Sequence, residues 1–307
     1  MGHGHGHGHA AGRAVDRSRL RLVLALTVTV LVAALVGAWW SGSLALLADA
    51  AHMATDAGAV TLALAASYVA SRPVSARRSF GWHRAEILAA LVNAVVLLAV
   101  CAFLLVEGVR RLADPPEVEA GPMLAFAVAG LVANAVSLGL LAGRRGESLN
   151  MRGAYLEVLS DLVGSCAVVV AALFVLVGDV LRADPVATLL IAVLILPRAW
   201  SLAREAIDVL LEATPPGLDP EEIRTHLLDV PGVVDVHDLH VWTITSGMPS
   251  LSVHVTVEDE TLELQGVGAL LDRFSACIAA HFEVDHTTFQ LEPRSHRDHE
   301  HLGDLHP

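Results

Sequence analysis

Two pairs of polar residues, each spaced four apart, interrupt long apolar segments of this 307-residue chain. The first pair is His52 and Asp56, and the second is Glu157 and Asp161. On a helix, residues i and i+4 lie on one face, so each segment presents two side chains in the same direction. A carboxylate at membrane depth costs at least about 2.5 kcal/mol, so it requires a partner or a function. Facing each other, the pairs would supply one imidazole and three carboxylates, a four-ligand site for a divalent cation.

The donor atoms of this set indicate which ions it binds. Nitrogen and oxygen donors suit zinc, cobalt, cadmium, manganese or iron better than monovalent copper, which prefers sulfur. Four protein ligands fit tetrahedral zinc best. The same side chains bind protons, so a site that opens to each side of a membrane in turn would exchange metal for protons. The residues predict a metal–proton antiporter, and the alternative is a polar stripe that faces a water-filled vestibule without binding metal.

Other polar residues lie on the same apolar segments. Asp49 is three residues before His52, on the same stripe but nearer the outer end, and we expect it to line a vestibule rather than bind the ion. Asn93 and Asn134 lie in two further segments, where an amide side chain ordinarily forms a hydrogen bond to a neighbouring helix. Asn93 is also a candidate supporting residue near the site.

Six apolar segments account for the composition, which is 54% apolar with a mean hydropathy of +0.57. Each approaches or exceeds the roughly 20 residues that a helix needs to span a bilayer. The segments are 20–40, 44–70, 85–112, 121–142, 154–178 and 184–203. The first is too long for a cleaved signal peptide and is followed by five more, so we expect a six-helix membrane domain over 20–213.

Arginine residues gather in alternate loops between these segments. They are Arg13, Arg17, Arg19, Arg21, Arg72, Arg77, Arg78, Arg84, Arg144, Arg145, Arg152, Arg198 and Arg204. By the positive-inside rule these loops are cytoplasmic, which predicts both termini in the cytoplasm and the chain in a plasma membrane. The bias to Ala and Arg indicates a GC-rich bacterium.

The chain changes character after residue 213. The sequence TPPGLDP, with two adjacent prolines and a glycine, ends the last long helix and marks a domain boundary. From Glu205 to the end there are 20 acidic residues and four arginines. An acidic domain argues against nucleic-acid binding and suits a domain that attracts cations.

The pattern over 214–292 predicts a small cytoplasmic α/β domain, with tails at 1–19 and 293–307. We expect a helix at DPEEIRTHLLDV, two strands at VVDVHDLHVWTI and SLSVHVTVED joined by the turn SGMPS, a helix at LELQGVGALLDRFSACIAAHF, and a last strand at HTTFQLE. The order αββαβ gives a two-layer domain of three strands and two helices.

Histidines in this domain form a second candidate metal site. His237 and His254 lie on the two paired strands and can meet across the hairpin, while His286 and Glu292 flank the last strand. His240 lies on the first of these strands as well. The acidic surroundings favour regulatory metal binding, and scattered surface histidines are the alternative.

Histidine also recurs in both tails. The opening MGHGHGHGH cannot form a core, and its histidines can chelate zinc, nickel or copper loosely. An affinity tag is the alternative to a native metal-capturing tail, although such tags are usually uninterrupted runs. The residues concerned are His3, His5, His7 and His9, with His296, His299, His301 and His306 in the acidic C-terminal tail.

The chain resembles the cation diffusion facilitator family of zinc transporters over about residues 20–292. The resemblance is carried by SLALLADAAHMATDA, FGWHRAEILAALVNA and VHDLHVWTITSGMPSLSVHV. It implies six spans and a cytoplasmic ferredoxin-like domain, in a homodimer that exports zinc or similar divalent ions from the cytoplasm in exchange for protons. The family's transport site uses HxxxD or DxxxD in span two and usually HxxxD in span five. His52, Asp56 and Asp161 match these motifs.

Glu157 departs from the family pattern, because zinc members commonly carry His there. A charged hard ligand in place of a neutral borderline one is expected to weaken discrimination against manganese and to alter the number of protons exchanged. The family's His-rich loop between spans four and five is also absent from GRRGESLNMRG, and the N-terminal tail is a candidate substitute.

The resemblance also assigns roles in the cytoplasmic domain. His237, His254, His286 and Glu292 fall at positions resembling the family's regulatory metal ligands, where metal stabilises the dimer. His240, in the family's LHVW signature, resembles a residue with a conformational or supporting role rather than a ligand.

Two other functional classes fit parts of the sequence. An intramembrane metal-dependent hydrolase needs a general base beside an open metal position, and motifs such as HExxH are missing. A membrane metal sensor would use the spans only as an anchor, and would not depend on His52 or Asp161. We expect a transporter rather than an enzyme, with zinc as transported ion and regulatory ligand and no organic cofactor.

Overall fold

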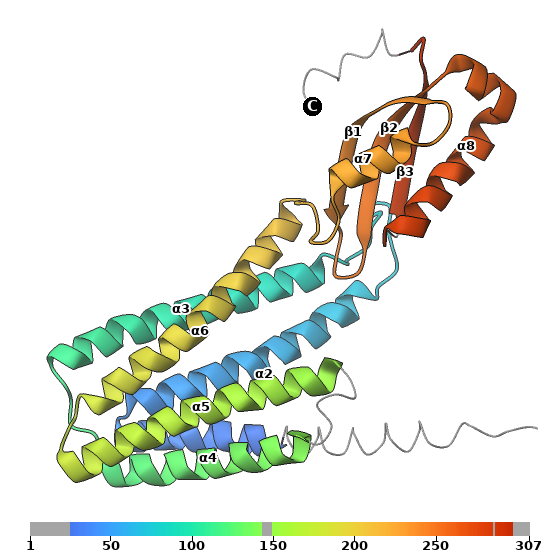
Figure 1. Cartoon of the computed structure of the whole chain (residues 1–307). Helices are drawn as coiled ribbons and strands as arrows, with labels where there is room; N and C mark the ends of the chain where they lie inside the picture. Colours follow the sequence, from blue (N-terminus) through green and yellow to red (C-terminus); the bar gives the residue numbers. More distant parts are fainter. Residues whose placement is uncertain (1–24, 143–148, 285, 297–307) are drawn as a thin grey trace, which may run out of the picture. The chain divides into compact units, whose positions relative to one another are not determined.

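The computed structural model describes residues 25–142, 149–284 and 286–296, with the backbone alone for 149–154 (Figure 1). These residues belong to two compact units. The first contains the described residues up to Thr61 together with those within Asn93–Ser201. The second contains Leu62–Val92 together with the described residues from Leu202 onward.

Five long helices make up most of the chain before residue 211. They are α2 (Leu44–Ala70), α3 (Ala85–Ala113), α4 (Ala120–Ala142), α5 (Leu149–Gly178) and α6 (Ala183–Leu210). All five have the length and composition needed to cross a membrane, and a shorter apolar helix, Ala25–Ser41, precedes them. Even the 23-residue α4 rises about 34 Å, more than the roughly 30 Å hydrocarbon core of a bilayer. The predicted arrangement of apolar helices is confirmed, with the shorter helix in the place of the first span.

Small residues pack between these helices, and large apolar residues cover their outer faces. Several alanines of the core are fully buried: Ala45, Ala48, Ala172, Ala192 and Ala199. Small side chains let helix backbones approach closely within a membrane. Large side chains that are more than half exposed include Phe103, Val106, Phe174 and Val177. Such a surface suits lipid rather than water, so the chain is a multi-pass membrane protein.

The chain after α6 forms the predicted α/β fold. Its elements are α7 (Pro220–Leu228), β1 (Val233–Thr243), β2 (Pro249–Val257), α8 (Asp259–His281) and β3 (His286–Pro293). The order αββαβ is confirmed. The sheet order is β1-β2-β3, with β1 antiparallel and β3 parallel to β2. The start of α7 is set by Asp219, whose carboxylate accepts a hydrogen bond from the N–H of Glu221, and by Pro220 in the first turn.

Both helices of this fold cover the same face of the sheet. Leu227 of α7 and Phe274 of α8 are buried in one apolar cluster with Val253 and Val255 of β2. Because side chains alternate along a strand, His254 points to the opposite face. That second face is therefore the polar one.

The polar face is interrupted by a bulge in β1. His237 pairs directly with His254, the register then shifts, and His240 pairs with Ser252. Within the bulge Asp238 has a φ of 47°, in the left-handed region. A bulge of this kind re-aims the side chains on either side of it.

Candidate metal centre

In the first unit, α2 carries the first predicted pair. His52 and Asp56 lie one helical turn apart, and Nε2 of His52 is 3.4 Å from Oδ2 of Asp56. The imidazole is buried, with His52 only 5% exposed. The i, i+4 spacing therefore produces the convergence that the sequence predicts.

Helix α5 adds Asp161 to this pair. Its Oδ1 atom lies 3.7 Å from Nε2 of His52. One ligand atom each from His52, Asp56 and Asp161 all lie within 4.8 Å of one another. Ligand atoms about 2.0 Å from a tetrahedral zinc ion are about 3.3 Å apart, so only small side-chain movements separate this group from a bound ion.

The converging atoms are buried and have no hydrogen-bond partner within the described part of the chain. They are both ring nitrogens of His52, Oδ2 of Asp56 and Oδ1 of Asp161. Leaving a buried polar atom without a partner costs about 1–3 kcal/mol, and more for a charged group. A divalent cation or protons would satisfy all of these atoms together.

The first turn of α2 is fixed by a carboxylate from α6. Asp184, completely buried, accepts hydrogen bonds from the Ser43 hydroxyl and from the backbone N–H groups of Leu44 (2.9 Å) and Ala45 (3.1 Å). A helix leaves these first N–H groups without internal partners. Asp184 is not among the residues that the sequence predicts for the site, because it caps a helix that begins 140 residues earlier. An acidic residue at the start of an apolar span is the signal that points to it.

A chain of hydrogen bonds lies one helical turn from His52. The Ser165 hydroxyl donates to Oδ2 of Asp49 (3.5 Å) and accepts from Nδ2 of Asn134 (3.1 Å), which joins α2, α5 and α4. Asn134 thus forms the interhelical bond expected of it. Asp49 is 4% exposed, so it is a buried, hydrogen-bonded residue and not the open vestibule residue that the sequence suggests. A Cβ atom on Gly164 would lie 2.9 Å from Oδ1 of Asp49, which shows how closely α5 approaches this carboxylate.

Glu157, the fourth predicted ligand, faces a cation of the protein. Its Oε1 lies 3.5 Å from Nη2 of Arg198 on α6, and the same nitrogen lies 4.0 Å from Oδ1 of Asp56. Among the described residues, the group of mutually close ligand atoms contains His52, Asp56 and Asp161 but not Glu157. The structure therefore brings together three of the four predicted ligands. The half-buried Asn93 of α3 is not part of the group either.

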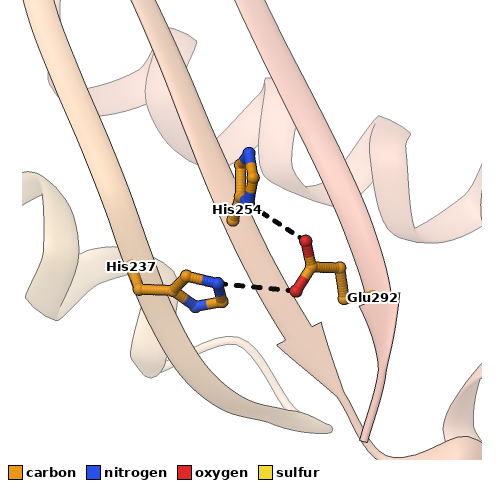
Figure 2. A group of neighbouring side chains, drawn as sticks. All are labelled: His237, His254 and Glu292. Atoms are coloured by element: carbon orange, nitrogen blue, oxygen red, sulfur yellow. Dashed lines mark ion pairs between the residues drawn. The ribbon is translucent and has the colours of Figure 1, made fainter. Parts of the chain in front are cut away.

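Three residues of the α/β fold form a second group (Figure 2). His237 comes from β1, His254 from β2 and Glu292 from β3, with one ligand atom of each within 4.8 Å of the others. Nδ1 of His254 is 3.0 Å from Oε1 of Glu292, and Nε2 of His237 is 3.4 Å from Oε2. Glu292 is only 1% exposed. Two imidazoles around a buried carboxylate are either an ion-paired cluster or three ligands of one metal ion.

Each of these histidines is backed by an aspartate. Oδ2 of Asp235 lies 3.5 Å from Nδ1 of His237, and Oδ2 of Asp238 lies 3.6 Å from Nε2 of His254. A carboxylate behind a metal-bound histidine orients the ring and fixes its tautomer. Neither aspartate is predicted from the sequence. The spacing D-x-H already places Asp235 on the face of His237, whereas Asp238 reaches His254 only because of the bulge.

His286 does not join this group within one chain, so its role as a ligand stays a prediction. It pairs with Ser250 at the start of β3, whereas Glu292 pairs with Thr256 near the end. Six residues of strand separate the two, about 20 Å. His240 is exposed beyond the bulge, with Nε2 2.9 Å from Oδ1 of Asp238. It stands beside the group and is not one of its three members.

Most of the tail histidines fall outside the described residues, and His296 is exposed at the end of the described chain. Those outside are His3, His5, His7, His9, His299, His301 and His306.

Two family models match the chain one after the other. A cation efflux transmembrane domain matches residues 20–211, and the cytoplasmic domain of cation efflux proteins matches residues 215–294. The chain belongs to the cation efflux family. The two matches meet at the break that follows α6, so the cation efflux protein has the two-part organisation of its family, and its α/β fold is the family's cytoplasmic domain.

Curated relatives cover nearly the same part of the chain. The metal cation efflux system protein CzcD of Cupriavidus metallidurans is 42% identical over 85% of this chain and 82% of its own length. Zinc transporter ZitB of Escherichia coli is 39% identical over 85% of this chain and 83% of its own. The cadmium, cobalt and zinc/H(+)-K(+) antiporter of Bacillus subtilis is 33% identical over 87% of this chain and 86% of its own. The family of this cation efflux protein is therefore one of transporters.

Proposed function

We propose that this protein exports divalent metal ions, with zinc the best-fitting substrate, from the bacterial cytoplasm in exchange for protons. His52, Asp56 and Asp161 would bind the ion during transport. The observation that carries the proposal is the convergence, in the first unit, of their buried nitrogen and oxygen atoms, which have no hydrogen-bond partner among the described residues. The names of the relatives, which include a zinc transporter and a proton-coupled antiporter, support the same substrate and coupling.

The exchange follows from what these atoms can bind. A neutral imidazole and ionised carboxylates replace water molecules around a divalent ion when the site is open to the cytoplasm. Protons that reach the same atoms from the other side displace the ion, because each atom holds either a proton or the metal. Cobalt, cadmium, manganese and iron are the alternative substrates, since they accept the same donors.

Zinc uptake into sealed proteoliposomes under an imposed pH gradient tests this proposal. We expect gradient-dependent uptake by the wild type, none by Asp161→Ala, and wild-type uptake by Glu117→Ala, because Glu117 is an exposed acid that follows α3. A protein that senses metal through its cytoplasmic domain would give no uptake at all. Full uptake by Asp161→Ala would show that the ion takes another route.

A second, regulatory metal site in the cytoplasmic domain is supported by the arrangement around Glu292. Each of its two histidines has one ring nitrogen toward Glu292 and the other toward an aspartate, which is the orientation expected of metal ligands. We propose that metal bound by His237, His254 and Glu292 stabilises a homodimer through this domain. Sedimentation of the full-length protein with and without zinc tests it: a dimer strengthened by zinc in the wild type but not in Glu292→Ala is the expected result.

The distribution of arginine supports a plasma-membrane orientation with both termini in the cytoplasm. In that orientation the histidine-bearing tails would meet cytoplasmic metal before it reaches the membrane site. Deleting residues 1–12 is expected to weaken uptake only at low zinc concentration. Unchanged uptake at every concentration would contradict a capturing role.

A further inference from the structure

Arg198 lies beside the membrane metal group but has no part in the transport mechanism proposed above. It follows Pro197 within α6, and its Nη2 atom reaches Oε1 of Glu157 (3.5 Å) and Oδ1 of Asp56 (4.0 Å). A guanidinium stays protonated in proteins and offers no lone pair, so it cannot bind a metal ion. A permanent positive charge at a cation site therefore requires an explanation.

The two oxygens of Asp56 face different side chains. Oδ2 points to Nε2 of His52, where the transported ion would bind, and Oδ1 points to Arg198. Glu157 directs Oε1 to the same guanidinium nitrogen. The guanidinium is thus held between a ligand of the ion and the carboxylate that the sequence predicts as a further ligand.

The charges of the group match one divalent ion. When ionised, the carboxylates of Asp56, Glu157 and Asp161 contribute three negative charges, and Arg198 contributes one positive charge. The formal charge of these four side chains, counted without the neighbouring Asp49 that is hydrogen-bonded to Ser165, is therefore −2, which one divalent ion cancels while His52 binds as a neutral imidazole. Without the guanidinium the group would be overcharged, and Glu157 would have the ion as its nearest attractive partner.

We propose that Arg198 is a specificity-determining residue that holds Glu157 away from the transported ion. The ion then takes His52, Asp56 and Asp161 as its protein ligands and completes its coordination with water. Excluding a further hard oxygen donor favours zinc over manganese, which prefers carboxylates and water. It also keeps the ion bound loosely enough to be released. This inference rests on the transport site proposed above.

A double-mutant cycle in proteoliposomes tests the inference through the KM for zinc and the ratio of manganese to zinc uptake. Arg198→Gln lets Glu157 bind the ion, so the KM for zinc falls about tenfold and the manganese ratio rises by a similar factor. Glu157→Gln leaves the guanidinium unbalanced beside the ion, so the KM rises about tenfold. The double variant keeps the charge of −2 and the three ligands, so both quantities return to within about twofold of the wild type.

Arg204→Gln is the matched control, because Arg204 lies further along α6 and pairs with Asp208 at 3.7 Å. We expect it to behave as the wild type. A double variant that loses zinc uptake would overturn the inference, because Glu157 would then be a ligand. An effect of Arg198→Gln that is the same in the wild type and in Glu157→Gln would also overturn the inference. If Arg198→Gln does not fold, Arg198→Met replaces it in the cycle, because it removes the charge and keeps an unbranched side chain, and an unchanged manganese ratio there overturns the inference.

Asp161→Ala in the same assay separates the two proposals. If uptake persists in Asp161→Ala, the proposed transport site is wrong, and the proposed role of Arg198 is wrong as well. If Asp161→Ala is inactive and the cycle shows no coupling between Arg198 and Glu157, the transport site stands and only the inference about Arg198 is wrong.

Discussion

Asp184→Ala removes the carboxylate that closes the first turn of α2. In the wild type this buried group accepts hydrogen bonds from the Ser43 hydroxyl and from the N–H groups of Leu44 and Ala45. His52 comes eight residues after Leu44, about 12 Å along the helix. The position of the first turn therefore sets where His52 and Asp56 stand relative to Asp161 on α5.

The expected loss of stability in Asp184→Ala follows from these three hydrogen bonds. A hydrogen bond to a charged acceptor contributes about 1.5–3 kcal/mol, so three at the lower limit amount to about 4–5 kcal/mol. The bonds go to the two oxygens of one carboxylate and are not independent. We therefore expect the free energy of unfolding to fall by about 3–5 kcal/mol, as when a buried charged contact is broken. Asp184→Asn keeps one acceptor oxygen and is expected to lose about half as much.

Thermal unfolding of the purified protein in detergent measures this loss. At 2–4 °C per kcal/mol for a protein of this size class, Asp184→Ala lowers the Tm by about 10 °C, and the same variant raises the KM for zinc. Asp114→Asn is the control, because Asp114 is an exposed acid in the loop after α3, and it should change neither quantity. A wild-type Tm and KM in Asp184→Ala would refute the argument that this carboxylate positions α2.

Three further predictions concern other parts of the molecule. If zinc binds the group around Glu292, it should raise the Tm of the cytoplasmic domain, and we expect His237→Ala to abolish this rise and His286→Ala to keep it. Calorimetry at increasing zinc concentration measures it, and an equal loss in both variants would contradict the three-residue group. Gly164→Ala forces a methyl group to within 2.9 Å of Oδ1 of Asp49. We expect lower zinc uptake and a free energy of unfolding that falls by about 1–3 kcal/mol, as uptake assays and thermal melts would show. Unchanged values would mean that α5 can shift. Burial raises the pKa of the Cys277 thiol. Alkylation of Cys277 should therefore be slower at neutral pH than alkylation of a free thiol, and should accelerate through alkaline pH, as mass spectrometry of its peptide would show. A fast reaction that levels off near neutrality would contradict this.

The membrane helices and the candidate ligands that converge from α2 and α5 could be predicted from the sequence because both signals are local. An apolar run of about 20 residues is readable without its neighbours, and so is the i, i+4 spacing of His52 and Asp56. The convergence of α2 with Asp161 is then the only long-range step. It could be predicted because a buried carboxylate needs a partner.

The residues that the sequence does not reveal act over long distances in the chain. Asp184 caps a helix that begins 140 residues before it, and no local pattern encodes that contact. Arg198 counts from sequence as a cytoplasmic charge at the end of a span, and only the packing of α6 brings it to Asp56 and Glu157. The separation of His286 from Glu292 within one chain likewise depends on strand register, which places them beside Ser250 and Thr256.

Anomalous diffraction at the zinc edge from crystals of the full-length protein grown with zinc tests the central claim most directly. A peak between His52, Asp56 and Asp161 is the predicted result, with Glu157 remaining on Arg198. Zinc found at His237, His254 and Glu292 while the membrane group stays empty at saturating zinc would contradict the claim that the transported ion binds there.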